Sequence, residues 1–276
     1  MVDAKQVRPL GDTPERSYAS KLSLFAQFAE PELRRVIDDL GVQEGDCVLD
    51  AGCGVAHATQ WLGGRAGPMG AVIGLDLSMP HLRSAPSPSL AHLVQGDLDR
   101  LCIRPGSIDW IWCCNAINHL SNPAGALRSL RAALRPGGQL ALAQSSFLPE
   151  MYFAWDARLE DEVRRACHRY YREKYGLDHE DISDARRLVG LMLETGFAKV
   201  SVRTYVIERI QPLSETDRAY FRSAVFEGYW GSKLRPYLTD ADWAALQALC
   251  DPGSAGFCLD RRDFHHVQTL TVVRSG

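Results

Sequence analysis

A turn with two glycines, residues 50–54 (DAGCG), is the segment of this sequence best suited to bind a ligand. Glycine has no Cβ atom, so a ligand can approach the backbone of such a turn closely. The dinucleotide fingerprint G-x-G-x-x-G does not fit, because His57 stands where its third glycine belongs. The carboxylate of Asp50 would also repel a pyrophosphate. The turn therefore favours a ligand that carries a positive charge.

Acidic residues and glycines flank three other apolar stretches of the chain. Asp76 closes the stretch at 71–75, Gly96-Asp97-Leu98 follows the stretch at 91–95, and LRPGG at 134–138 precedes a further one. A carboxylate at the position of Asp76 can accept hydrogen bonds from ribose hydroxyls. In a parallel sheet the carboxyl ends of the strands meet at one edge, where nucleotides bind. These residues predict a nucleotide-like ligand at that edge.

Apolar stretches alternate with helical segments in the first half of the chain, and this alternation predicts the fold. Strands are expected at residues 46–51, 71–75, 91–95, 108–113 and 139–143. Helices are expected at residues 31–40, at 56–62 with a break at Gly63-Gly64, between Ser78 and Pro86, and at 122–134. Such spacing predicts an α/β domain with a parallel sheet covered by helices on both faces.

The second half adds helices at 150–175 and 181–194 and two strands, 200–210 and 267–273, the latter rich in β-branched residues. A polar, helical insertion lies between these strands. We expect six segments: an N-terminal helical lid (1–44), a ligand-binding core (45–148), a helical insertion (149–180), a core helix and strand (181–211), a second helical insertion (212–262) and a last core strand (263–276).

With these motifs at the strand ends, residues 45–145 resemble the class I S-adenosylmethionine-dependent methyltransferases, in the broad group that includes ubiquinone and menaquinone methyltransferases. The resemblance implies a Rossmann-like, seven-stranded, mostly parallel sheet with helices on both faces and a helical substrate cover. It also implies S-adenosyl-L-methionine as cofactor and S-adenosyl-L-homocysteine as product. One departure is Ala56, where many members have a third glycine.

The resemblance implies cofactor-binding roles for residues after the strands. The glycine turn would surround the methionine part, Asp76 would hold the ribose, Asp97 would accept from the adenine amino group, and Asn115 would lie near the sulfonium. Tyr18 and Phe25 would close over the cofactor as a lid. The full cofactor-binding set is Asp50, Gly52, Gly54, Asp76, Leu77, Asp97, Leu98, Asn115 and Tyr18.

His119 is the candidate for a catalytic base. Methyl transfer from a sulfonium is an in-line displacement, in which positioning does much of the work. A base is needed only when the attacking atom carries a proton of high pKa. His119 follows the fourth expected strand, where the resemblance places the reaction centre, and histidine titrates near neutrality. A packing or loop-ordering role is the alternative.

Substrate information is expected from residues 151–276, which hold 17 of the 24 aromatic residues. Most of these would fill the core between the inserted helices. The insertions also follow the strands over which this family builds its substrate cover, which predicts an enclosed, aromatic-lined pocket for an organic small molecule. The substrate-binding candidates are Tyr152, Trp155, Tyr171, Tyr229 and Trp230.

We therefore expect an enzyme that methylates an O, N or C atom of a small, aromatic or hydrophobic metabolite of natural-product type. Methylation of a lipid-like quinone is the alternative enzyme reading. A protein that binds S-adenosylmethionine without transferring its methyl group is the alternative from another class. A net charge of −3 and a pI of about 6.2 disfavour a nucleic-acid substrate.

The remaining composition indicates where the chain works. Its eight cysteines form no C-x-x-C pair, and no ligand cluster for a metal is evident. Cys113 and Cys114 are successive strand residues, which point to opposite faces of a sheet and cannot chelate one atom together. No apolar leader and no stretch of ~18–20 apolar residues stands out. We expect a cytoplasmic protein with a small-molecule partner, no nucleic acid and no membrane span; a homodimer stays open.

Overall fold

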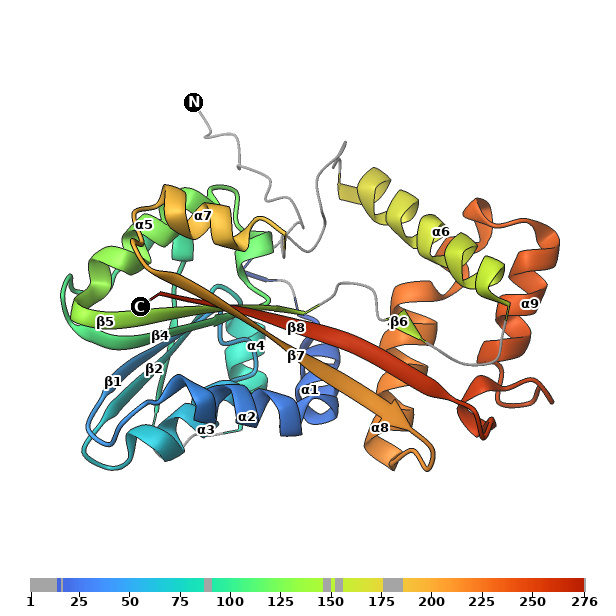
Figure 1. The fold of residues 1–276 in the computed structure, drawn as a ribbon, viewed down its shortest axis with the longest axis horizontal. Helices are drawn as coiled ribbons and strands as arrows, with labels where there is room; N and C mark the ends of the chain where they lie inside the picture. The colour runs from blue at the N-terminus through green and yellow to red at the C-terminus, as the bar shows by residue number, and fades with distance from the viewer. Residues whose placement is uncertain are drawn as a thin grey trace.

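The computed structural model describes residues 14–15, 17–86, 91–145, 150–151, 156–175 and 186–275. Figure 1 shows a sheet with helices above and below it, and a helical cover to one side. Two long antiparallel strands, β7 (Val200–Ile210) and β8 (His265–Ser275), run from the sheet into the cover. The two parts of the molecule therefore share these strands.

The sheet has the predicted, mostly parallel topology. Its order is β3-β2-β1-β4-β5-β8, with β7 on the other side of β8. The first five strands are parallel, and β8 is antiparallel to β5 and β7. The bounds are β1 Cys47–Ala51, β2 Ala71–Asp76, β3 His92–Gln95, β4 Ile108–Cys114 and β5 Leu134–Ser145, and a short β6, Glu150–Met151, extends the sheet beside β8.

Helices cover both faces because neighbouring strand residues alternate between two apolar cores. Val48 packs in the core beneath α2 (Glu30–Leu40) and α3 (His57–Ala66), whereas Leu49 packs in the core beneath α5 (Pro123–Ala133) and α7 (Leu188–Glu194). Figure 1 shows the two pairs of helices on opposite faces. α1 (Ala19–Phe28) contacts α4 (Met79–Ser84), the helix that follows β2.

The cover is built from two helical segments of the chain, one between β6 and α7 and the other between β7 and β8. Its elements are α6 (Ala157–Tyr175), α8 (Glu215–Ala219), the π-helix η3 (Tyr220–Trp230), η4 (Ser232–Tyr237), α9 (Asp240–Cys250) and η5 (Cys258–Asp260). Ser214 and Asp217 form a capping box at the start of α8, and the Thr239 side chain accepts a hydrogen bond from the Asp242 N–H at the start of α9.

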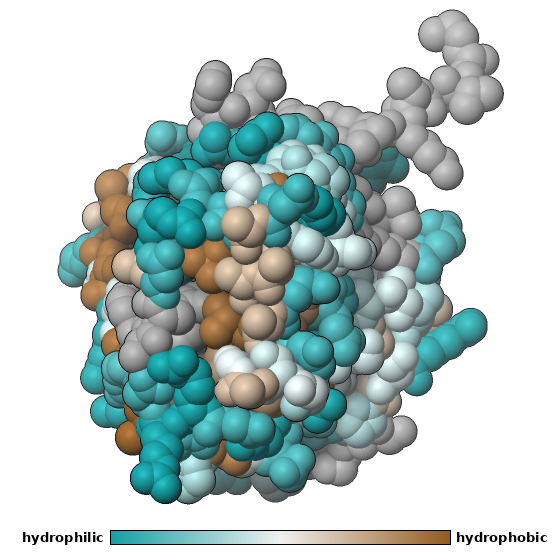
Figure 2. Space-filling view, turned by 90° about the vertical axis from the view of Figure 1, so that its right-hand side faces the viewer, coloured by the Kyte–Doolittle hydropathy of each residue, from teal (hydrophilic) through white to brown (hydrophobic). Residues whose placement is uncertain are grey.

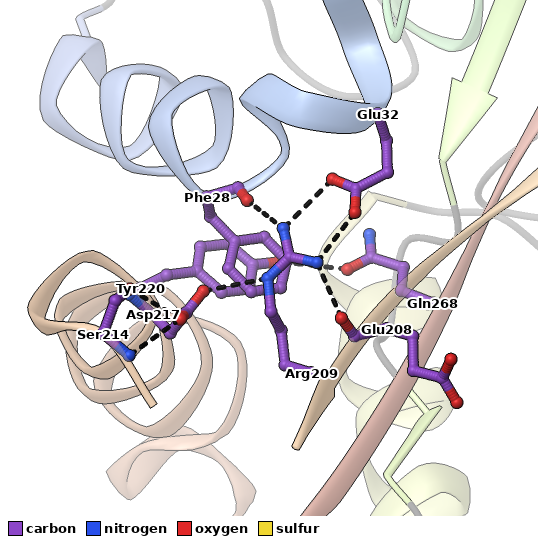
Figure 3. Close-up of polar contacts among 8 residues, drawn as sticks. All are labelled: Phe28, Glu32, Glu208, Arg209, Ser214, Asp217, Tyr220 and Gln268. Atoms are coloured by element: carbon purple, nitrogen blue, oxygen red, sulfur yellow. Dashed lines mark hydrogen bonds and ion pairs between the residues drawn. The ribbon is translucent and has the colours of Figure 1, made fainter. Parts of the chain in front are cut away.

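Arg209 joins the cover to the first helices (Figure 3). Its guanidinium pairs with both carboxylate oxygens of Glu32 at 2.8 and 3.0 Å and with Asp217 Oδ1 at 2.9 Å, and it lies 4.6 Å above the centre of the Phe28 ring. The Phe28 ring stacks on Tyr220 at 4.0 Å between centroids. The corner between α1 and α2, strand β7 and the start of the cover are thereby fixed to one another.

Several predicted boundaries were wrong. α3 continues through Gly63-Gly64 to Ala66, because Leu62 and Ala66 are fully buried in the core and packing outweighs the low helix propensity of glycine. β5 begins at Leu134, ahead of the strand predicted at residues 139–143, and pairs with β4 through a register irregularity. α6 begins at Ala157, since residues 150–151 pair with β8 instead of opening the helix.

Candidate functional site

A cavity of about 300 Å³ lies between the carboxyl ends of the parallel strands and the cover. One wall comes from the glycine turn after β1, the end of β2 and the segments after β3 and β4. The opposite wall comes from α1, α6, η3 and η4. The cavity therefore lies at the sheet edge that the sequence predicted for a ligand.

The glycine turn is held tightly against its surroundings. The N–H groups of Gly52 and Cys53 both donate to the carbonyl oxygen of Leu75, at 2.7 and 3.0 Å. Gly52 has φ +80°, and a Cβ there would lie 2.5 Å from the Cβ of Ala116. Only glycine therefore fits this part of the cavity wall. Ala56, with φ +62°, adopts the left-handed conformation that favours glycine, which costs about 1–2 kcal/mol.

Asp76 is the best-oriented carboxylate of the cavity wall. Its Oδ2 accepts from the Gly54 N–H at 2.8 Å, and its Oδ1 accepts from the Ser78 N–H at 2.8 Å and faces His81 Nδ1 at 3.3 Å. A carboxylate oxygen has two acceptor sites, so Oδ2 can accept one further hydrogen bond from a ligand. The side chain is thus fixed in place with one acceptor site left over.

His81 orients Asp76, and the sequence analysis did not identify it. The Tyr18 N–H donates to His81 Nε2 at 3.3 Å, so Nε2 is unprotonated and the proton on Nδ1 points to Asp76. The rings of Tyr18 and His81 also meet edge to face, 4.6 Å apart. No local sequence pattern indicates this role, because the Tyr18–His81 contact joins residues 63 positions apart.

Asp50 and Asp97 differ from the prediction, since neither belongs to the cavity wall. Asp50 lies behind the turn, 2% exposed, and accepts from Thr59 Oγ1 at 2.6 Å. Burial raises its pKa to about 7, and the nearby charge of Asp76 also raises it. The Asp97 carboxylate caps the short helix η1 (Leu98–Arg100) by accepting from the Asp99 N–H at 2.9 Å. Both carboxylates therefore accept hydrogen bonds from nearby groups of the protein.

The segments after β4 and β5 bring acceptor oxygens to the cavity. Asn115, in the left-handed conformation at φ +53°, accepts through Oδ1 from Gln144 Nε2 and from both the N–H and the hydroxyl of Ser145. Gln144 Oε1 and Asn118 Oδ1 are buried in the wall and have no hydrogen-bond partner within the described ranges. A buried acceptor without a donor is costly, so this region favours a ligand that donates hydrogen bonds.

The remaining residues predicted for the cofactor and for catalysis line the cavity. Leu77, Leu98, Tyr18 and His119 line the cavity, His119 from the short helix η2 (Ile117–His119). Cys113 and Cys114 point to opposite faces as predicted; Cys113 packs in the core beneath α5, and Cys114 lines the cavity.

The aromatic candidates divide in the same way. Tyr171 and Tyr229 line the cavity, whereas Trp230 does not, because it stacks on Phe226 inside the cover at 5.4 Å. Tyr152 and Trp155 lie outside the described residues. The sequence analysis missed Lys21, Lys174 and Lys233, which line the cavity from the cover side. Their scarcity was the available signal, since the chain has only five lysines.

Metal-binding clusters and membrane-spanning helices are both absent from the part of the chain that the structure describes. No group of three or more histidine, cysteine, aspartate or glutamate side chains is arranged to hold a metal ion there. No helix in those ranges is both long and apolar enough to cross a membrane.

Comparison with known proteins gives one family match, in which residues 49–142 match the model of a methyltransferase domain. The chain is 34% identical over 161 residues to a malonyl-[acyl-carrier protein] O-methyltransferase of Pseudescherichia vulneris, which covers 57% of this chain and 61% of the relative. It is 30% identical over 117 residues to a demethylmenaquinone methyltransferase of Staphylococcus aureus, which covers 41% of this chain and 48% of the relative. The chain thus spans about half to three-fifths of these relatives.

Solved structures agree on the fold. A putative methyltransferase from Bacillus halodurans has a TM-score of 0.52 and 16% identity, covering 88% of this chain and 98% of its own. A phosphoethanolamine N-methyltransferase from Haemonchus contortus has a TM-score of 0.53 and 15% identity, covering 93% of this chain and 58% of its own. At these identities the likeness concerns the arrangement of the sheet and its helices.

Proposed function

We propose that this chain is an S-adenosylmethionine-dependent methyltransferase with a Rossmann-like fold and that it methylates a small organic molecule enclosed beneath its cover. The observation that carries the proposal is the cavity itself. It joins a fixed ribose-type acceptor, Asp76, and a glycine turn on one wall to a cover with two tyrosines on the other. The atom of that molecule that receives the methyl group is O, N or C.

The residues present fit S-adenosylmethionine. Gly52 and Gly54 line the cavity, and Asp76 Oδ2 retains an acceptor site for a ribose hydroxyl. The acceptor oxygens of Gln144 and Asn118 suit the ammonium group of the cofactor. When bound, the cofactor supplies an electrophilic methyl group on a positively charged sulfur.

The chain's own residues would then enclose and orient the acceptor. His119 lines the cavity beside Asn118 and is our candidate to take a proton from a hydroxyl or amine acceptor. Tyr171 and Tyr229 offer aromatic surface opposite the sheet edge. Tyr18, which the His81 contact holds at the cavity, and Phe25 would close over the cofactor.

A small acceptor fits the structure better than a lipid-like quinone. A quinone with a long tail would require an apolar surface that continues into the cavity. The large exposed hydrophobic residues of β7 (Val202, Val206 and Ile210) are not among the residues that line the cavity. Figure 2 shows that the hydrophobic areas on the cover's outer face are interrupted by hydrophilic side chains.

Calorimetric titration with S-adenosylmethionine, S-adenosylhomocysteine and NADH tests the proposal. We expect micromolar binding of the two sulfur compounds and none of NADH. Asp76→Asn should weaken that binding by about 1–3 kcal/mol, the worth of a hydrogen bond to a charged group. Asp251→Asn, an exposed carboxylate outside the cavity, is the matched control. If neither sulfur compound binds, the proposed function is wrong. The methyl acceptor is then identified by incubating the chain with S-adenosylmethionine and each member of a panel of phenols, amines and carboxylic acids, and measuring the S-adenosylhomocysteine that forms.

A further inference from the structure

Three lysines from three separate elements line the cover side of the cavity. Lys21 comes from α1, Lys174 from the last turn of α6 and Lys233 from η4. The chain has only five lysines, and the ion pairs seen elsewhere among the described residues are made by arginine and histidine. This concentration of lysine at one wall calls for a chemical reason.

The three ammonium groups converge on one region. Lys233 Nζ donates to the carbonyl oxygen of Gly228 and to the Tyr171 hydroxyl, the latter at 3.1 Å. A Cβ on Gly228 would lie 3.3 Å from Lys21 Nζ, so Lys21 approaches the same glycine. Lys174 Nζ and Lys233 Nζ both lie over the Tyr170 ring, 5.7 and 5.4 Å from its centre.

Two of the three lysines, Lys21 and Lys233, carry positive charge that the described residues do not compensate. Within the described ranges, no carboxylate forms an ion pair with Lys21 or Lys233. The pKa of Lys233 is lowered to about 8, most by burial and then by the charges of Lys21 and Lys174. Converging cations are mutually repulsive unless a counter-charge joins them. Arg209, by contrast, is fully matched by Glu32 and Asp217.

The two walls of the cavity therefore differ in charge. The sheet wall carries the Asp76 carboxylate and suits the cationic cofactor. The cover wall carries the three lysines next to Tyr171 and Tyr229. An acceptor with an aromatic or apolar body and a negatively charged end would place that end at the cover and its remainder toward the cofactor.

We propose that the methyl acceptor carries an anionic group, a carboxylate or a phosphate, and that Lys21, Lys174 and Lys233 bind this group at the cover wall of the cavity. The inference rests on the proposed function, because it assumes that the acceptor occupies the same cavity as the cofactor. It narrows the substrate class from any small metabolite to small organic acids.

The test is calorimetry on the full chain saturated with S-adenosylhomocysteine, at pH 7 and low salt. The probes are benzoate, phenyl phosphate and benzamide, the last being a neutral molecule of the same shape as benzoate. We expect at least one anion to bind ~10-fold or more tightly than benzamide. The tighter anion distinguishes a carboxylate from a phosphate, and either result supports the proposal.

Lysine variants identify the site. Lys233→Met and Lys21→Met should each weaken binding of the preferred anion ~10- to 100-fold, the range for a hydrogen bond to a charged group. Lys233→Arg should retain most of the affinity, because it keeps the charge. Lys199→Met, an exposed lysine before β7, is the control and should change nothing.

Affinity for S-adenosylhomocysteine distinguishes a failure of the proposed function from a failure of the anion site. If the wild-type chain does not bind it, the proposed function fails. If it binds but benzamide matches both anions, or no probe binds up to 10 mM, the anion site is wrong. Unchanged anion affinity in both methionine variants, or an equal loss in Lys199→Met, also overturns the proposal.

Discussion

Replacing Asp50 by asparagine should change the pH dependence of stability. In the folded chain the Asp50 carboxyl is buried and its pKa is raised from 3.8 to about 7. At pH 4–7 the unfolded chain therefore releases this proton more readily than the folded chain, so the stability contributed by this group falls as pH rises through that window. The difference between 3.8 and about 7 corresponds to ~4 kcal/mol.

Asp50→Asn removes this titration while keeping a partner for Thr59, since an asparagine side-chain oxygen can accept the same hydrogen bond. Relative to the variant, the wild-type chain should lose about 3 kcal/mol of unfolding free energy between pH 4.5 and pH 8, since the first part of the change falls below pH 4.5. Urea denaturation followed by circular dichroism at half-unit pH intervals measures this difference.

Asp46→Asn, just before the same strand, is the matched control because it removes a carboxylate without touching the cavity. Parallel stability curves for the wild-type chain and Asp50→Asn across this pH range would refute the reasoning. That result would mean that Asp50 is ionised in the folded chain at all these pH values.

Three other substitutions test the site and its support. Gly52→Ala should abolish measurable binding of S-adenosylhomocysteine by calorimetry, since the new Cβ would meet Ala116 at 2.5 Å; unchanged affinity would contradict the close fit of the turn. His81→Leu should weaken the same binding by about 1 kcal/mol. Because His81 acts through Asp76, adding His81→Leu to Asp76→Asn should weaken binding no further than Asp76→Asn alone; additive effects of the two substitutions would contradict this role. Arg209→Met should lower the free energy of unfolding, measured by urea denaturation, by about 2–3 kcal/mol, because it leaves Glu32 without its partner. Adding Glu32→Gln to the Arg209→Met variant should restore part of that loss. An Arg209→Met chain as stable as the wild type would show that the cluster is dispensable.

The sequence predicted most of the fold because local patterns carry it. Each strand of the parallel sheet is a short apolar run, and the helices between them show clear start and stop residues, such as Ser78 and Gly41. Predictions failed where tertiary packing outweighs a local preference. Gly63-Gly64 reads as a break in isolation, yet it lies within a helix whose neighbours Leu62 and Ala66 fill the core.

The site was predictable where the backbone defines it and not where side chains choose among partners. Gly52 and Asp76 reach the cavity because a turn and a strand end bring them there. Asp50 satisfies the same sequence rule, but Thr59 provides a closer partner and holds it behind the turn. The roles of His81 and Lys233 depend on contacts with distant segments, which no local pattern encodes.

The scarcity of lysine has a practical consequence for handling this protein. Amine-directed reagents, such as succinimidyl esters, have few targets in this chain, and three of its five lysines line the cavity. Coupling to beads or dyes through amines would therefore modify the ligand-binding wall itself. The same property allows footprinting, since a bound ligand should shield Lys21 and Lys233 from acylation while Lys199 continues to react. Surface attachment should use another group, such as the exposed thiol of Cys102.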